Sequence, residues 1–211
     1  MKQRRTIHDS DWRDGFLFVS NHLALDFLNT RPIQNGDAIE LLSDFGALLR
    51  WFKAAGLLST REMVNLQRQG ESVTARRTLE VIRQFREKLR KEILAWEGGA
   101  DVHRTIVDEL NRLMAAHPML GKLQATGNGP SMELWFETRQ PDDLFAPLVH
   151  SAAKLFAEAD RNRVRKCGQC VLHFYDTSKK GTRRWCSMQL CGNRLKVAAY
   201  AARQRLNAKE R

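Results

Sequence analysis

The chain has 211 residues, of which 43% are hydrophobic, so it is long and apolar enough to bury a core, and general disorder is excluded. No apolar run follows the basic N-terminus, and no stretch approaches the roughly 18 apolar residues of a membrane span. The composition therefore predicts a cytoplasmic protein without a membrane partner. The formal net charge is +11, and its position along the chain is informative.

The first 160 residues predict a mainly α-helical fold with a small β component, an α+β class. A polar tail to about residue 14 precedes a short strand at 16–19 and an apolar segment of helix length at 23–30. A turn is expected at 31–36. Apolar residues at three- and four-residue steps, with capping and glycine signals at the ends, then predict helices over 43–55, 59–69, 73–96, 102–116 and 141–160. Gly127-Asn128-Gly129-Pro130 predicts a β-hairpin with strands in 120–126 and 132–138.

Two polar residues, Asp26 and Asn29, interrupt the apolar segment at 23–30. They are candidate ligand-binding residues, in a pocket for a small-molecule effector. The alternative, which the usual behaviour of such residues favours, is that they satisfy nearby backbone groups or cap a helix.

All four cysteines lie near the C-terminus, as Cys167-x₂-Cys170 and Cys186-x₄-Cys191, with fifteen residues between the pairs. Two short turns that each supply two thiolates can converge on one tetrahedral ion, so the spacing predicts one structural Zn²⁺ per chain. Incidental buried thiols or two disulfides are the alternative. The expected cytoplasmic location, where thiols stay reduced, disfavours it.

The excess positive charge lies on the same segment. Residues 161–211 hold 14 Lys and Arg against 2 Asp and Glu, whereas residues 1–160 hold 21 against 22. Four bound thiolates and Zn²⁺ would subtract only about two charges. This asymmetry indicates a polyanionic partner, double-stranded DNA in the simplest case, with a solvated basic tail as the alternative.

The remainder of this segment predicts how it folds and binds. Phe174, Tyr175 and Trp185 are expected to form a small core around the cysteine pairs, and Lys179-Lys180-Gly181 an exposed loop tip. A helix is expected from the last cysteine onward, with an apolar stripe between basic flanks, which suits a DNA groove. Alternatively, its Arg and Lys stems lie beside a core stripe. The candidate DNA contacts are Lys179, Lys180, Arg183, Arg184, Arg194, Lys196, Tyr200 and Arg203.

No catalytic centre is predicted. A site closed by four thiolates has no open position for a water ligand, and His173 is not needed to complete it. The other five histidines have no recognisable partners in the sequence, and there is neither a glycine-rich phosphate loop nor a Gly-x-Ser-x-Gly motif.

The segment from Arg163 to Lys196 resembles the CGNR zinc finger, whose name-giving run is Cys191-Gly192-Asn193-Arg194. Upstream, Leu25-Asp26-Phe27-Leu28-Asn29-Thr30 resembles the ABATE domain that usually accompanies this finger. The resemblance implies Cys167, Cys170, Cys186 and Cys191 as the ligands, and a bacterial, stress-related transcription regulator as the function.

Together these features predict an ABATE-like regulatory domain over 15–160 and a zinc-bound DNA-binding module over 161–211. The first part would sense a signal or assemble a homodimer, and the second would contact DNA, without enzymatic activity. One alternative is an adaptor whose zinc module docks on RNA or on an acidic protein surface. Another is an enzyme that acts through the N-terminal part, with a pocket around Asp26 and Asn29.

Overall fold

The computed structural model of the chain describes residues 11–34, 36–127 and 129–192. Helices dominate this part, and its strands form two-stranded antiparallel sheets, so the predicted α+β class is confirmed. The helices are α1 (Leu23–Leu28), α2 (Phe45–Ala54), α3 (Thr60–Gln67), α4 (Val73–Glu97), α5 (Arg104–Ala116) and α6 (Phe145–Glu158), the last preceded by the 3₁₀ turn η1 (Pro141–Leu144). None of the helices described is both long and apolar enough to cross a membrane.

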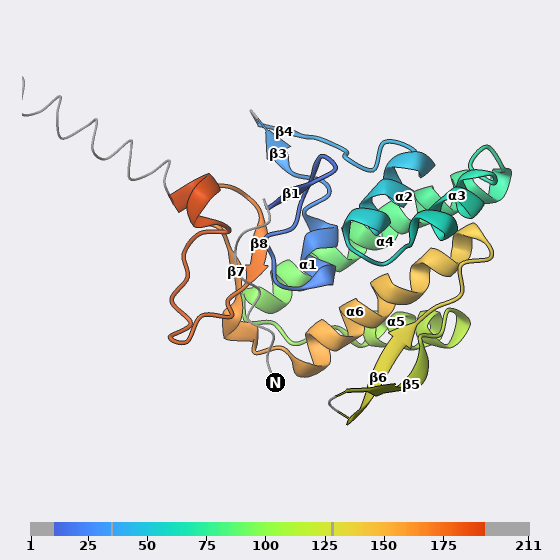
Figure 1. Cartoon of the computed structure of the whole chain (residues 1–211). Helices are drawn as coiled ribbons and strands as arrows, with labels where there is room; N and C mark the ends of the chain where they lie inside the picture. The colour runs from blue at the N-terminus through green and yellow to red at the C-terminus, as the bar shows by residue number, and fades with distance from the viewer. Residues whose placement is uncertain (1–10, 35, 128, 193–211) are drawn as a thin grey trace, which may run out of the picture.

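Within the described residues, the sheets are four hairpins. They pair β1 (Trp12–Arg13) with β2 (Phe16–Leu17), β3 (Ile33–Gln34) with β4 (Asp37–Ala38), β5 (Leu120–Thr126) with β6 (Gly129–Trp135), and β7 (Val164–Lys166) with β8 (His173–Tyr175). In Figure 1 the β7–β8 hairpin and the segment after it lie at one end of the helices, beside α1. We call residues 161–192 the cysteine segment and α1–α6 with their connections the helical body.

The predicted polar tail to residue 14 is wrong at its end, because Trp12 and Arg13 form a strand. The turn that joins this strand to β2 has positive φ at both central residues, 49° at Asp14 and 80° at Gly15. This conformation matches the twist of a hairpin, and Asp-Gly is a preferred sequence for it. Asp14-Gly15 was therefore a hairpin signal in the sequence, which the pattern of apolar residues did not show.

Side-chain caps set the helix starts. Ser59 and Glu62 form the predicted capping box of α3, in which each side chain accepts a hydrogen bond from the backbone N–H of the other residue. Helix α2 begins after Asp44, whose carboxylate accepts from Ala47 N at 2.7 Å, rather than near Ser43. Carboxylates are favoured at this end of a helix because they satisfy free N–H groups.

The core of the helical body is centred on the long helix α4. Its buried residues confirm the predicted apolar stripe and include Leu79, Ile82, Phe85, Leu89, Ile93 and Trp96. The Trp51 ring on α2 is fully buried and lies 5.8 Å from the Phe27 ring on α1, which lies 6.3 Å from the Phe85 ring. Aromatic pairs at these separations add to the stabilisation from buried apolar area.

Arginines of α4 hold the chain that leaves α1. Arg90 donates to the carbonyl oxygen of Leu28 at 2.5 Å, and Arg83 donates to that of Leu42 at 3.0 Å. Between them, Arg86 donates to Thr30 Oγ1 at 2.8 Å and forms an ion pair with Glu40. These bonds fix the C-terminal end of α1, which faces the cysteine segment.

Candidate metal centre

The β7–β8 hairpin presents the first cysteine pair. Lys166 and His173 are its last paired residues, and Cys167 N donates to Leu172 O at 2.9 Å, so Cys167 and Cys170 lie in the tight turn between the strands. In the second pair, Cys186 lies just before the short helical turn η3 (Met188–Gly192) and Cys191 lies within it, where Cys191 N donates to Ser187 O at 3.0 Å.

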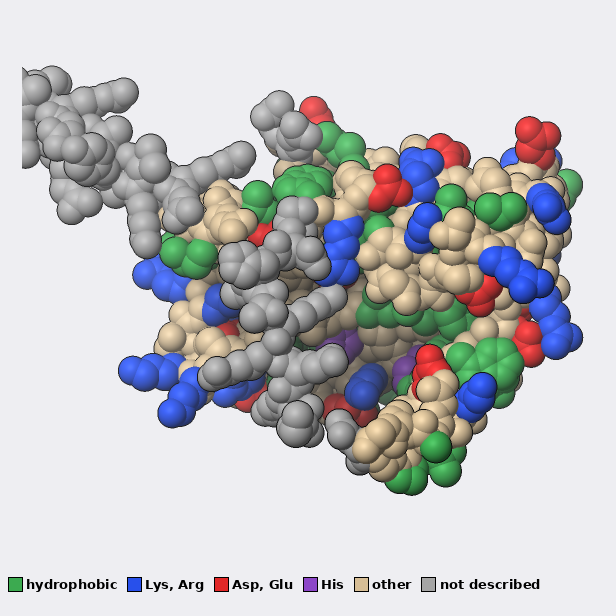
Figure 2. All heavy atoms as spheres, viewed as in Figure 1, with side chains coloured by type: hydrophobic (Ala, Val, Ile, Leu, Met, Phe, Trp, Pro, Cys, Tyr) green, Lys and Arg blue, Asp and Glu red, His purple; other side chains and the backbone are tan. Residues whose placement is uncertain are grey.

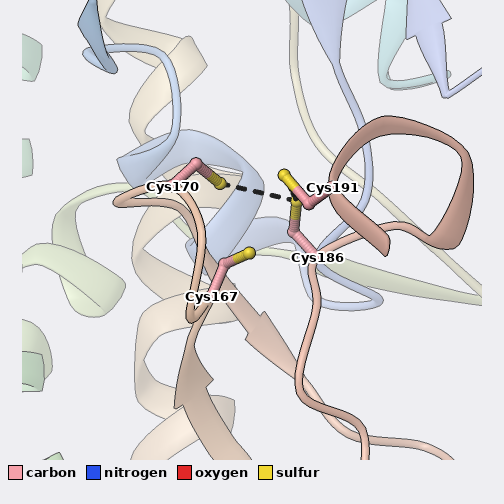
Figure 3. Close-up of side chains that lie close together, drawn as sticks. All are labelled: Cys167, Cys170, Cys186 and Cys191. Atoms are coloured by element: carbon pink, nitrogen blue, oxygen red, sulfur yellow. Dashed lines mark hydrogen bonds between the residues drawn. The ribbon is translucent and has the colours of Figure 1, made fainter. Parts of the chain in front are cut away.

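The four Sγ atoms converge between these two turns (Figure 3) and lie within 4.8 Å of one another. The Cys170–Cys186 and Cys186–Cys191 sulfur separations are 3.6 and 3.5 Å. Four thiolates at about 2.3 Å from a tetrahedral Zn²⁺ would lie about 3.8 Å apart. Three of the cysteines are buried and Cys170 is partly exposed. The donor set and its spacing therefore fit zinc with little movement.

The charges of the cluster also fit a cation. A hydrogen bond with Cys186 lowers the pKa of Cys170 to about 5, whereas burial raises the pKa of Cys191 to about 12. The hydrogen bond with Cys170 raises the pKa of Cys186 as well. One thiolate in this cluster thus opposes ionisation of its neighbours, and four thiolates together require a compensating positive charge.

Trp185 and Gly168 bring the two turns together. Gly168 N donates to Arg184 O at 3.1 Å, and a Cβ at Gly168 would lie 3.0 Å from the Trp185 ring, so a side chain there would require the ring to shift. Phe174 and Trp185 belong to the hydrophobic cluster around the cysteines, as predicted. Tyr175 does not, because its ring packs against the main core instead.

Asp176 organises the loop between β8 and the second cysteine pair. Its buried carboxylate accepts from Ser178 N and Arg183 N, both at 2.8 Å, and lies 3.9 Å from Arg165 Nε. Burial opposes its ionisation, but these hydrogen bonds and the Arg165 charge prevail and hold the pKa of Asp176 below its usual value. The bond from Ser178 N to the Asp176 side chain closes a turn at residues 176–178.

Arg183 serves the protein's own structure. Its guanidinium donates to the carbonyl oxygens of Trp185, Val19 and Cys186, and it lies 4.4 Å from the centre of the Phe174 ring. These contacts use the Nε and Nη2 donors of Arg183. Arg183 therefore ties the second cysteine pair to the chain that follows β2.

Three other predicted DNA contacts lie on the surface. Lys179 and Lys180 are exposed at the loop tip, and Arg184 is exposed with its guanidinium 5.4 Å from the centre of the Trp185 ring. Figure 2 shows Lys and Arg side chains at the end of the molecule that holds the cysteine segment. The helix expected after Cys191 and its candidate contacts lie outside the described residues: Arg194, Lys196, Tyr200 and Arg203.

Asp26 and Asn29, the candidate ligand-binding residues, are both buried and engaged within the protein. Asp26 accepts from Ser20 N at 3.0 Å. The Asn29 amide accepts from His173 N at 3.0 Å and donates to His173 O at 2.9 Å. Both residues therefore satisfy backbone groups, which is the alternative that the sequence favoured. The sequence did not indicate that the backbone satisfied by Asn29 belongs to the cysteine segment.

Two further residues join the rest of the protein to the cysteine segment, Ser20 before α1 and Glu97 at the end of α4, and no motif in the sequence pointed to them. Ser20 Oγ donates to His173 O at 2.9 Å, and Tyr175 N donates to Ser20 O at 2.8 Å. At the end of α4, Glu97 accepts from Lys166 N at 2.9 Å and lies 3.2 Å from His173 Nε2. Ser20 and His173 are 153 positions apart in the sequence, which is why no local pattern identified such partners.

Comparison with protein families gives two matches. Residues 21–159 match ABATE, described as "Putative stress-induced transcription regulator", and residues 163–204 match the CGNR zinc finger. No curated protein matches the chain. Neither family description names a catalytic activity. The second match covers the four clustered cysteines, and the first covers the helices that hold them in place. The chain therefore belongs to the ABATE family and carries a CGNR zinc finger in its C-terminal part.

Proposed function

We propose that this protein is a DNA-binding transcription regulator in which Cys167, Cys170, Cys186 and Cys191 hold one structural Zn²⁺. The observation that carries the proposal is the convergence of four sulfur atoms within 4.8 Å on the part of the chain that holds the whole excess of positive charge. In this proposal residues 15–160 are the regulatory domain and residues 161–211 the DNA-binding module.

Zinc would act here as a cross-link. A four-thiolate site has no open position, so the ion would join two turns that a small apolar cluster holds only weakly. The joined turns would fix the exposed basic residues that flank the cysteines. Fixing those side chains before binding reduces the entropy lost when DNA is bound.

The candidate contacts differ in how they are held. Lys179 and Lys180 lie at the tip of a loop whose base is fixed by Asp176 and by Arg163, which donates to Ser178 O at 2.9 Å. Arg184 lies over the Trp185 ring next to a metal ligand. A flexible lysine tip suits sequence-independent phosphate contacts, and a fixed guanidinium suits a bidentate contact with a phosphate or a guanine.

Selection of bound sequences from random duplex DNA tests the proposal directly. We expect the zinc-loaded protein to bind duplex DNA with an affinity that falls steeply as salt rises, and to enrich a preferred site. Structured RNA and an acidic protein serve as competitors. Zinc-loaded protein that binds no duplex at low salt would contradict the proposal, and preferential binding of either competitor would favour an adaptor instead.

A further inference from the structure

The β5–β6 hairpin has an apolar face. The strands pair Leu123 with Met132 and Gly121 with Leu134, and side chains on a strand alternate between its two faces. A Cβ at Gly121 would lie 3.0 Å from Met132 Sδ, so the Met132 side chain crosses the pair on this side. The face, called here the apolar face, consists of six residues: Gly121, Leu123, Ala125, Pro130, Met132 and Leu134.

All six residues of the apolar face are exposed. The exposed fractions of the large side chains are 68% for Leu123, 67% for Met132 and 49% for Leu134. Single exposed apolar residues are common, but a contiguous group of this kind marks an interaction surface.

The opposite face of the hairpin carries the charged and amide side chains, and at the end farthest from the turn also the Leu120–Trp135 pair, of which Trp135 is 42% exposed. Lys122 pairs there with Glu133, which also accepts a hydrogen bond from Gln124. The only partly buried residues of the two strands, Leu120 and Gln124, are on this same face. The hairpin therefore turns its polar face toward the protein and its apolar face toward solvent, the reverse of an ordinary half-buried sheet. Figure 2 shows hydrophobic side chains on the outer side of this hairpin.

We propose that the apolar face is a homodimer interface, in which two copies stack their β5–β6 hairpins face to face about a twofold axis. Leu123 and Met132 would lie at the centre, where each copy covers the side chains of the other. A twofold interface brings one surface against itself, so it requires a self-complementary surface.

The chemistry of the face favours a second copy over a different partner. It carries no charged or hydrogen-bonding side chain that a particular ligand would need to match, and two such faces meet without desolvating a polar group. A two-stranded hairpin alone is marginally stable, and stacking on a second sheet supplies the missing layer. The positive charge that would make copies repel lies in residues 161–211 and not on this hairpin.

The size of the face predicts a weak dimer. Two strands of seven residues give a ribbon roughly 23 Å long and 10 Å wide. The area of such a face is smaller than the roughly 800 Å² that each partner buries in a stable interface. We therefore expect monomer and dimer in exchange. The role of the dimer rests on the proposed function. If each chain binds DNA, a dimer carries two DNA-binding modules, and binding of one module to its half-site raises the effective concentration of the other at the second half-site.

Sedimentation velocity of the full zinc-loaded chain without DNA tests the interface. Over about 1 to 200 μM protein we expect a concentration-dependent shift toward a dimer. Leu123→Asp should raise the dimer dissociation constant at least about tenfold, because it places a charge at the interface centre. Ser131→Asp adds the same charge on the opposite face of the hairpin and should change the constant less than about twofold.

Met132→Ala provides a second, uncharged variant, which should weaken the dimer without introducing repulsion. Circular dichroism checks that each variant keeps its helices. A chain that stays monomeric across the range would overturn the proposal, as would a dimer that Leu123→Asp leaves unchanged. Because DNA is absent, these results are independent of the proposed function, and a monomer that binds DNA would refute the dimer alone.

Discussion

Arg86 illustrates how single residues secure the helical body. Its side chain is 1% exposed, yet it carries a charge that Glu40 and Glu87 balance. Burial would lower the pKa of Arg86, but the hydrogen bonds and charges of these carboxylates raise it. Burial likewise opposes ionisation of Glu40, and Arg86 prevails and lowers the pKa of that carboxyl. The pair holds the chain beyond α1 against α4.

Replacing Glu40 should therefore be costly. Removing one partner of a buried ion pair destabilises a protein by about 3–5 kcal/mol, and since Glu87 would still face Arg86 we expect about 2–3 kcal/mol for Glu40→Gln. Glu80→Gln is the control, because Glu80 is 59% exposed and its pair with Arg83 should contribute less than about 1 kcal/mol. Urea unfolding measures both, and equal effects would contradict the assignment.

The same pair has a predictable pH dependence. The folded-state pKa of Glu40 is lowered, so its contribution to stability is fully present above the unfolded pKa of about 4.3 and is lost as pH falls through the lower folded value. The difference in unfolding free energy between the wild type and Glu40→Gln should be constant above about pH 5 and shrink below about pH 4. A difference that grows on acidification would refute this sign.

At the scale of elements, the outer edge of β8 is completed by residues of the helical body rather than by a third strand. Ser20 and Asn29 bond the backbone of Tyr175 and His173 that the pairing with β7 leaves free. An open strand edge is a liability that proteins cover. Here the cover comes from Ser20, which precedes α1, and from Asn29, which caps its C-terminal end, so the helix end and the cysteine segment stabilise each other.

The same substitution at Asn29 and at Asn21 tests the hydrogen bonds that these residues make to β8. Asn29→Asp removes a buried amide donor and adds a charge beside His173 O, which should destabilise the protein by at least about 2 kcal/mol. Asn21→Asp removes an exposed donor to Tyr175 O and should cost less than about 1 kcal/mol. Amide hydrogen exchange at His173 N should accelerate only in the first variant. Similar exchange in both would show that the contact with β8 does not depend on Asn29.

For the molecule as a whole, the metal should determine whether the cysteine segment is ordered. Metal analysis should find about one Zn²⁺ per chain, and Cys186→Ser should lower zinc affinity by at least about 100-fold in chelator competition. Far-UV circular dichroism should change little, because α1–α6 bury a core that does not include the cysteines. Full zinc occupancy of this variant against the chelator would refute the ligand assignment.

The charge of the whole molecule should appear in the salt dependence of DNA binding. Each phosphate contact adds about 0.9 to the slope of log affinity against log salt, so Lys179→Gln and Lys180→Gln should each lower the slope by about that amount. Lys53→Gln, an exposed lysine on α2, removes the same charge from the helical body and should leave the slope unchanged. Equal effects in all three variants would indicate a general charge effect rather than contacts.

Local patterns were sufficient for most of the fold. The capping box at Ser59, the apolar stripe of α4 and the hairpin after Leu120 each depend on residues close together in the sequence, and all three were predicted and found. The second strand of the hairpin, however, is Gly129–Trp135 rather than the predicted 132–138, because Gly129 and Pro130 belong to the strand and not to the turn. The strand at Trp12 was missed because two residues are too short for a periodic pattern. The reversed orientation of β5–β6 was hidden because alternation shows that a strand has an apolar face but not where that face points.

The sequence by itself determined the clustering of four cysteines at zinc-binding spacing and the confinement of positive charge to residues 161–211, because spacing and charge are properties of the covalent chain. Only the tertiary structure decided how those charges are used. It directed Arg183 inward to carbonyl oxygens and left Lys179 and Lys180 exposed, although all three have the same formal charge. Likewise, Asn29 became a link to His173, 144 positions away, because a buried amide must find hydrogen-bond partners wherever folding places them.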